Sequence, residues 1–192
     1  MAGALVHFCH TLIAVTTRRY TKTLGVRIDA VVNNAAISSW GASGSTFEQL
    51  DLSFKTNAIG PAVLIEALEP LLKKSTAATP RIVNVTSGAG SLTRRLDPTK
   101  PLYDQKAVPY RTSKAALNMV SACQAYEYGP LGWKVFCYNP GFTVSNLSGM
   151  NTAENGARPT SEGAKPIVDM LDGKRDEDHS KYCNGDQGYY PW

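Results

Sequence analysis

The stretch R-I-V-N-V-T-S-G, residues 81–88, decides the fold of this 192-residue chain. Its apolar residues run together instead of alternating, which is typical of a strand buried on both faces of a parallel sheet. Two similar runs flank it, Ile28 to Val32 before it and Trp133 to Tyr138 after it. A shorter run, Ser180 to Cys183, is a candidate last strand.

Helical patterns alternate with these strands. A capping box at residues 45–48 marks a helix start, and Pro61 should kink the helix that follows. Pro109 is suited to the first turn of another helix. A long polar loop is expected between residues 88 and 109. The helices expected from these patterns span residues 4–24, 46–74, 109–128 and 160–171.

The alternation of strands and helices predicts the fold class. It indicates right-handed crossovers and a Rossmann-like α/β fold, a parallel sheet with flanking helices, in a single domain over residues 1–192. A composition with 43% hydrophobic and 19% charged residues fits a globular protein. In such a sheet, ligands bind beyond the carboxyl ends of the strands.

Charge and hydropathy exclude several classes of partner. The net charge is only +4, and the basic pairs, Arg18-Arg19, Lys73-Lys74 and Arg94-Arg95, are scattered, so we expect no binding to nucleic acid. The sequence has no stretch of about 18 apolar residues, so we expect no membrane span.

Cysteine and histidine usage points to a reducing compartment without a metal site. The four cysteines form no C-x-x-C pair, which is typical of free thiols and favours a cytoplasmic location. The three histidines do not combine with cysteines or carboxylates at the spacing of a zinc site. We therefore predict no metal.

Polar residues follow the strands where a ligand should bind: Asn33-Asn34, then Ser87, then Pro140-Gly141. Tyr110 and Lys114 are four residues apart, so they share one face of a helix. An ammonium beside a phenol lowers the pKa of the phenol, which makes the tyrosine usable as a general acid or base near neutral pH.

Each of these residues also has a structural interpretation. Asn33 can cap the end of the sheet, Asn57 can bond backbone at the Pro61 kink, and Ser87 can cap a turn. The tyrosine–lysine pair by itself fits a solvated helix turn. Five motifs occurring in one order favour chemistry: V-V-N-N-A-A (31–36), K-T-N-A-I-G-P (55–61), R-I-V-N-V-T-S-G (81–88), Y-R-T-S-K-A-A (110–116) and N-P-G-F-T (139–143).

In this order the motifs resemble the short-chain dehydrogenase/reductase family, most of all its carbonyl-reductase-like branch. The resemblance begins near residue 10 and includes the ending G-Y-Y-P-W. It implies an oxidoreductase that uses NADP or NAD and acts on a small carbonyl or alcohol substrate. It also implies a homodimer formed through the helices around 46–74 and 109–128.

The resemblance assigns the catalytic roles to Asn57, Ser87, Tyr110 and Lys114. Tyr110 would give the proton to the substrate carbonyl oxygen, and Ser87 would orient that carbonyl. Lys114 would lower the pKa of Tyr110 and hold the nicotinamide ribose, while Asn57 would hold a relay water.

The same resemblance implies the cofactor contacts. Asn34 would lie near the cofactor ribose, which Tyr110 and Lys114 also approach. Thr143 and Ser145 would grip the nicotinamide amide.

The family's glycine-rich turn T-G-x-x-x-G-x-G does not occur in this sequence, and Ala36 replaces a family glycine. Residues 10–34 already resemble the family's third helix and fourth strand, so we expect the first strands of the dinucleotide-binding half to be lacking. Cofactor binding should then be weakened, and Ile28 to Val32 should form an apolar edge of the sheet. Two alternatives to catalysis stay open: a non-catalytic truncated homologue acting by association, and an incomplete fragment of a longer enzyme.

Overall fold

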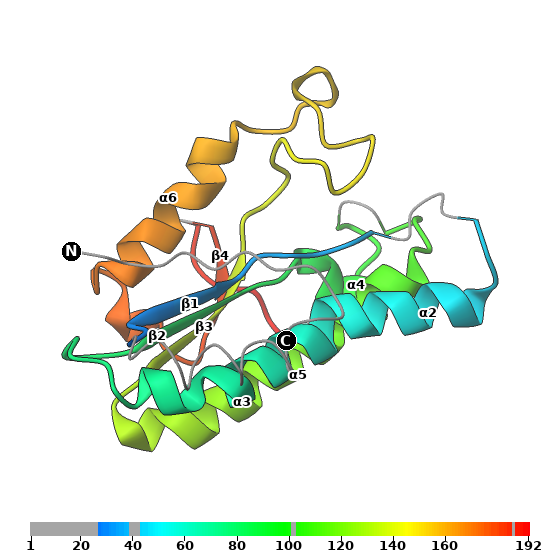
Figure 1. The fold of residues 1–192 in the computed structure, drawn as a ribbon. Coiled ribbons are helices and arrows are strands. Elements are labelled where there is room, and N and C mark those ends of the chain that lie inside the picture. Colours follow the sequence, from blue (N-terminus) through cyan, green and yellow to red (C-terminus); the bar gives the residue numbers. More distant parts are fainter. Residues whose placement is uncertain (1–26, 39–42, 101–102, 186) are drawn as a thin grey trace.

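A computed structural model of the chain describes residues 27–38, 43–100, 103–185 and 187–192. Within these residues the strands are β1 (Ala30–Asn33), β2 (Arg81–Val85), β3 (Lys134–Asn139) and β4 (Tyr182–Asn184). They form one parallel sheet in the order β1-β2-β3-β4, shown in Figure 1. The predicted Rossmann-like α/β sheet is confirmed. The expected helix over 4–24 lies outside the described residues.

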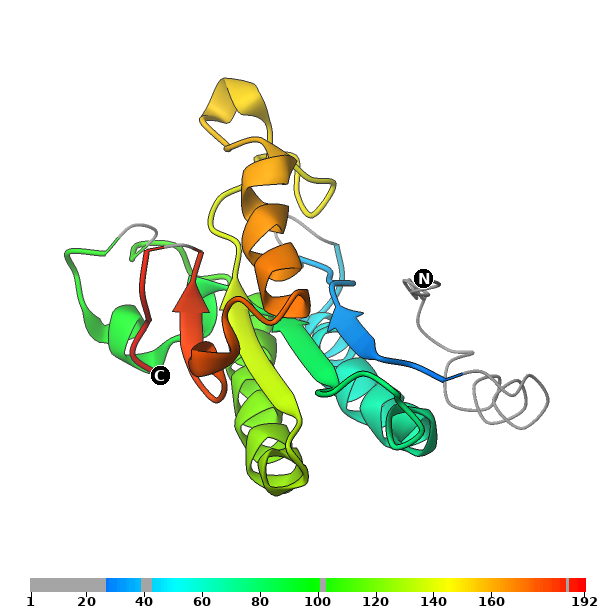
Figure 2. The ribbon, with the colours of Figure 1, turned by 90° about the vertical axis from the view of Figure 1, so that its left-hand side faces the viewer.

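Helices cover both faces of this sheet. Figure 2 shows α6 (Thr160–Leu171) on one face, and α3 (Gly60–Leu72) and α5 (Val108–Tyr128) on the other. Residues of β2 alternate between these layers: Ile82 packs in the cluster with α3 and α5, and Val83 in the cluster with α6. Because both faces are buried, the strand carries apolar residues without alternation.

The long helix expected over 46–74 consists of three segments. α2 (Thr46–Phe54) begins at the predicted capping box, with both hydrogen bonds of the box between Ser45 and Glu48 present. A π-helical turn, Lys55–Ile59, then leads into α3. Pro61 lacks an N–H and would clash with the carbonyl four residues earlier, so a wider turn accommodates it where a kink was expected.

The expected polar loop between residues 88 and 109 contains two short helices. A 3₁₀ turn, Gly88–Gly90, follows Ser87, and α4 (Leu92–Leu96) comes next. The Ser91 hydroxyl accepts a hydrogen bond from the Arg94 N–H at 3.2 Å, which caps α4 at its start. The predicted polar loop thus contains two short helical segments that were not predicted, because the prediction overlooked this serine cap.

The strand bounds differ slightly from those expected, and Ile28 packs against the core outside β1. β1 forms one edge of the sheet made by the described strands. No helix among the described residues is long and apolar enough to cross a membrane.

Candidate active site

The first turns of α5 lie beside the carboxyl end of β2 and bring Tyr110 and Lys114 into the interior. Lys114 is only 1% exposed and Tyr110 only 9% exposed. The Lys114 Nζ donates a hydrogen bond to the carbonyl of Val85, the last residue of β2, at 2.9 Å. It also lies 5.9 Å from the centre of the Tyr110 ring. The predicted helical pair is therefore a buried pair.

Ser87 meets Tyr110 across the gap between β2 and α5. The Ser87 side chain lies close enough to the Tyr110 hydroxyl to lower the pKa of Tyr110. The Ser87 Oγ also accepts the Ala89 N–H at 3.2 Å, so it caps the 3₁₀ turn as the structural interpretation expected. The structural interpretation of Ser87 as a cap is therefore confirmed, and the turn sets where its hydroxyl points.

Burial dominates the pKa values of this pair. It raises the pKa of Tyr110, and the neighbouring Ser87 side chain partly offsets this rise. Burial also lowers the pKa of Lys114 to about 8. The expectation of a lowered pKa for Tyr110 is not met in this structure, because removal of the phenol from water is the largest effect on its pKa and raises it.

Asn57 sits in the π-helical turn and is fully buried. Its Oδ1 accepts the Ile37 N–H at 2.9 Å, and its Nδ2 donates to the Ile37 carbonyl at 2.9 Å. The Nδ2 also donates to the Ser113 Oγ at 3.0 Å. Asn57 therefore ties the segment after β1 to α5. The structural interpretation expected Asn57 to bond backbone near Pro61, but the backbone that it bonds is that of Ile37.

Three further residues expected at the cofactor lie beyond the carboxyl ends of β1 and β3, apart from the buried pair Tyr110 and Lys114: Asn34, Thr143 and Ser145. Asn34 is exposed, whereas Asn33 is buried and donates to the Asn84 Oδ1 at 2.7 Å. Thr143 and Ser145 lie in the loop between β3 and α6, which stands out from the ribbon in Figure 1. Their described hydrogen bonds stay within that loop and its neighbours, for example between the Ser145 N–H and the Asn151 carbonyl at 3.1 Å.

A buried polar network along α5 was missed by sequence reasoning. The Thr86 Oγ1 donates to the Asn118 Oδ1 at 2.6 Å, and the Asn84 Nδ2 donates to Gln124 at 2.8 Å and Ser121 at 3.0 Å. Asn118, Ser121 and Gln124 follow Lys114 at helical spacing. That spacing of polar residues on a core-facing helix was the signal that could have revealed the network.

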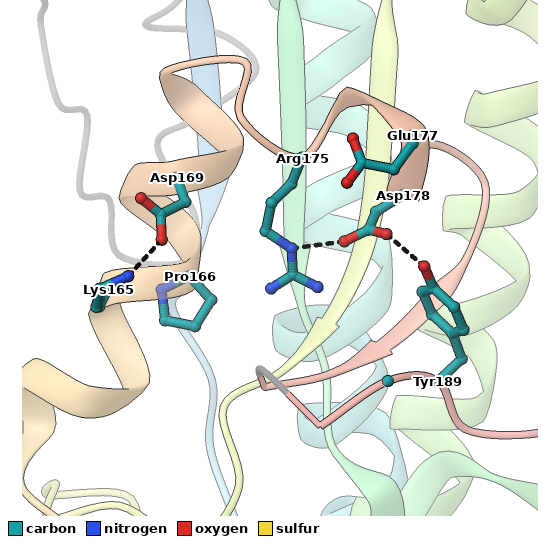
Figure 3. Close-up of a pocket in the computed structure, with 8 residues that line it drawn as sticks. Lys165, Pro166, Asp169, Arg175, Glu177, Asp178 and Tyr189 are labelled. Atoms are coloured by element: carbon teal, nitrogen blue, oxygen red, sulfur yellow. Dashed lines mark hydrogen bonds and ion pairs between the residues drawn. The ribbon is translucent and has the colours of Figure 1, made fainter.

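A separate cavity of about 420 Å³ lies between α6 and the segment after it, as Figure 3 shows. Four of its charged residues form two ion pairs: Lys165 with Asp169 at 2.7 Å, and Arg175 with Asp178 at 2.5 Å. The cavity is lined by Lys165, Pro166, Asp169, Arg175, Glu177, Asp178, Gly188 and Tyr189. None of the seven predicted site residues lines it, so we place the candidate chemistry at Tyr110.

Comparison with known proteins supports the assignment of these motifs. The family model described as short chain dehydrogenase matches residues 11–156. The short-chain dehydrogenase anuI of Penicillium roqueforti is 37% identical over 145 residues, which cover 73% of this chain and 56% of that protein. The C-signal protein of Myxococcus xanthus is 28% identical over 167 residues, covering 86% of this chain and 93% of that protein.

Among solved structures, the NADPH-bound carbonyl reductase from chicken fatty liver superposes with a TM-score of 0.75 at 26% sequence identity. The match covers 94% of this chain and 72% of the chicken chain. This chain therefore spans about half the length of the Penicillium relative and nearly three quarters of the chicken structure.

Proposed function

The chain belongs to the short-chain dehydrogenase family, and on that premise we propose that it transfers a hydride between NADP or NAD and a small carbonyl or alcohol substrate, with Tyr110 exchanging the proton. The observation that carries this proposal is the buried meeting of Tyr110, Ser87 and Lys114 beyond the end of β2. Ligands of parallel sheets bind at this edge.

Each residue has a role that follows from its surroundings. The raised pKa of Tyr110 keeps its hydroxyl protonated at neutral pH, ready to give a proton to a carbonyl oxygen. Ser87, which lies beside Tyr110, would donate a hydrogen bond to the same carbonyl oxygen and orient it. In the oxidation direction the same groups would take the proton back.

The residues at the carboxyl ends of the strands fit a nicotinamide nucleotide, which supplies or accepts the hydride when it is bound. An ammonium has three donors, and the Lys114 Nζ uses one on the Val85 carbonyl, so it can donate to ribose hydroxyls as well. Asn34, Thr143 and Ser145 would add contacts at the ends of β1 and β3. The NADPH bound to the chicken carbonyl reductase favours NADP among the two nucleotides.

We propose that Asn57 mainly holds the segment after β1 against α5, and that only its Oδ1 could take part in a water relay. Both N–H donors of its amide are used, on the Ile37 carbonyl and the Ser113 Oγ. A relay water would therefore have to donate to its Oδ1, which already accepts the Ile37 N–H.

Nucleotide binding is expected to be weak. The 192 residues contain no T-G-x-x-x-G-x-G turn, whose backbone would hold the pyrophosphate at a helix N-terminus. Contacts from Lys114 and the loop after β3 would then have to supply most of the affinity.

Titration with NADPH and NADH, followed by nucleotide fluorescence and calorimetry, tests the proposal. Binding in the range of roughly 0.1–1 mM is expected, which corresponds to about −5.5 to −4 kcal/mol. Oxidation of NADPH by a panel of aldehydes and ketones should then be detectable as a loss of absorbance at 340 nm. If neither nucleotide binds at millimolar concentration, the catalytic proposal for this chain is lost.

We also propose that the chain associates through α2 and α5. Such association would form a homodimer, and it is also how a non-catalytic homologue would act. Five large apolar side chains on these helices and on the π-helical turn after α2 are at least half exposed: Phe47, Leu52, Ile59, Met119 and Tyr126. Pairing of this surface between two copies would bury them. Sedimentation of the wild type against Met119→Glu tests it: a dimer that the variant dissociates supports pairing, and a wild-type monomer at about 100 μM rejects it.

The thiols support a cytoplasmic location as a proposal. Cys137 and Cys183 are buried and free, and Cys123 is exposed and free. Free thiols persist in reducing compartments. Fractionation of cells that express the tagged chain tests this location.

A further inference from the structure

Two side chains hold the peptide group between Ser87 and Gly88 from opposite sides. The Tyr182 hydroxyl donates a hydrogen bond to the Ser87 carbonyl, and the Asn139 Oδ1 accepts the Gly88 N–H at 3.2 Å. Tyr182 is the first residue of β4 and Asn139 is the last residue of β3. Neither residue has a part in the chemistry proposed above.

Tyr182 is itself held firmly. Its side chain is buried, and its ring meets Tyr190 edge-on at 5.5 Å and Trp192 at 5.3 Å between ring centres. Burial raises the pKa of its hydroxyl, so the group stays protonated and remains a donor. The side chain of Asn118, one helical turn after Lys114 on α5, lies near the Tyr182 hydroxyl and partly offsets that rise.

Asn139 is oriented by a second amide. Its Nδ2 donates to the Asn184 Oδ1 at 3.0 Å, which leaves its Oδ1 turned toward the Gly88 N–H. Asn184 is the last residue of β4. Both ends of the peptide group are thus controlled from β4, either directly or through β3.

The segment after β4 closes around the same turn. A Cβ added at Gly88 would lie 2.7 Å from the Tyr190 ring, so the ring presses directly on the backbone there. The Ser91 hydroxyl donates to the Pro191 carbonyl at 2.6 Å. The turn that carries Ser87 is therefore enclosed by side chains and backbone that follow it by about 100 residues.

We propose that Tyr182 and Asn139 are positioning residues for Ser87. By fixing the peptide group after Ser87 they fix the direction of its side chain, and so the position of the Ser87 hydroxyl beside Tyr110. This inference rests on the proposed function, because it assigns the two residues to the reaction that Ser87 and Tyr110 would carry out.

Tyr182→Phe is the sharpest variant, because it removes one hydroxyl and keeps the ring that packs on Tyr190 and Trp192. Tyr189→Phe is the matched control: the Tyr189 hydroxyl bonds Asp178 and Lys181, away from the turn. We expect Tyr182→Phe to lower kcat by about tenfold to a hundredfold, as small misplacements of reacting groups do, with KM for the nucleotide within about twofold. Tyr189→Phe should leave both parameters unchanged.

The pH profile separates positioning from a general structural effect. The neighbouring Ser87 side chain lowers the pKa of Tyr110, so displacing Ser87 should raise the apparent pKa of the general acid in Tyr182→Phe. Amide hydrogen exchange gives a measure that does not need turnover: exchange at Gly88 should accelerate in Tyr182→Phe and in Asn139→Ala, and stay unchanged in Tyr189→Phe.

The outcomes distinguish the two proposals. If the wild type turns over and Tyr182→Phe keeps the kcat and pH profile of Tyr189→Phe, the positioning proposal is overturned and the proposed function stands. If the wild type neither binds nucleotide nor turns over, the proposed function fails and takes the positioning role with it. A lower kcat, a raised apparent pKa and faster Gly88 exchange together support both.

Discussion

The ammonium of Lys114 lies 5.9 Å from the centre of the Tyr110 ring, one helical turn away on α5, and both side chains are buried. Burial shifts each group toward its neutral form: it raises the pKa of Tyr110 and lowers the pKa of Lys114 to about 8. The pair is therefore poised so that the lysine loses its charge close to physiological pH, while the phenol keeps its proton.

Replacing Lys114 by Met should stabilise the fold at neutral pH and remove a pH dependence. The folded pKa of about 8 lies below the ordinary 10.5, so between these values the unfolded chain binds more protons and stability rises with pH. Below pH 8 the buried charge costs free energy, and we expect Lys114→Met to be more stable than the wild type by about 2 kcal/mol at pH 7.

Urea unfolding at pH 7 and pH 9.5 measures this effect. The advantage of Lys114→Met should shrink by at least half at the higher pH, because the wild-type lysine is then mostly neutral in the folded state. Lys55→Met, at an exposed lysine paired with Asp51, is the control and should show no such trend. An equal advantage of Lys114→Met at both pH values would contradict the buried-charge argument.

Tyr110→Phe should lose turnover while keeping the fold. Removing a general acid typically lowers kcat by about 10²–10⁴-fold, and the phenyl ring fills the same space. Tyr126→Phe lies on the same helix with its side chain 87% exposed and should turn over like the wild type. Steady-state kinetics with circular dichroism checks both variants. Unchanged turnover in Tyr110→Phe would remove this residue from the mechanism.

Patterns set by local burial were predictable from the sequence. The continuous apolar run ending at Val85 needed a strand covered on both faces, and α6 has the predicted bounds Thr160–Leu171. The π-helical turn before Pro61 was not predictable, because a proline in a helix can be accommodated by a kink, a break or a wider turn. Which of these forms depends on the contacts that the turn makes, here those of the buried Asn57 within it, which bonds Ile37 and Ser113.

The candidate site was likewise predictable from the sequence only in part. The order of the motifs was enough to predict that Ser87 and Tyr110 meet, but not the sign of the pKa shift of Tyr110, which depends on how deeply the fold buries it. Tyr182 carried no signal, because it reaches the Ser87 carbonyl across 95 residues of sequence. Contacts between segments so far apart are set by the sheet register, here the pairing of Tyr182 with Cys137.

The buried ion pair after α6 should be important for stability. The Asp178 carboxylate is 4% exposed, accepts the Arg175 Nε–H at 2.5 Å and accepts the Tyr189 hydroxyl at 2.6 Å. Asp178→Ala leaves the Arg175 charge without its partner, and we expect a loss of roughly 3 kcal/mol in the free energy of unfolding. Asp51→Ala, which removes an exposed pair with Lys55, should change it by less than about 1 kcal/mol. Similar losses in the two variants, measured by urea unfolding, would show that burial does not set the difference.

Ala107, directly before α5, adopts the left-handed conformation, with φ 37° and ψ 40°. This conformation costs a residue with a Cβ roughly 1–2 kcal/mol, and glycine adopts it without that cost. Part of the gain is offset because glycine has more freedom in the unfolded chain, so we expect Ala107→Gly to stabilise the fold by about 0.5–1 kcal/mol. Ala116→Gly makes the same change inside α5, where helix propensity predicts a loss of about 1 kcal/mol. Thermal and urea unfolding of the two variants should therefore shift in opposite directions, and a loss of stability in both would mean that the strain at Ala107 is absent.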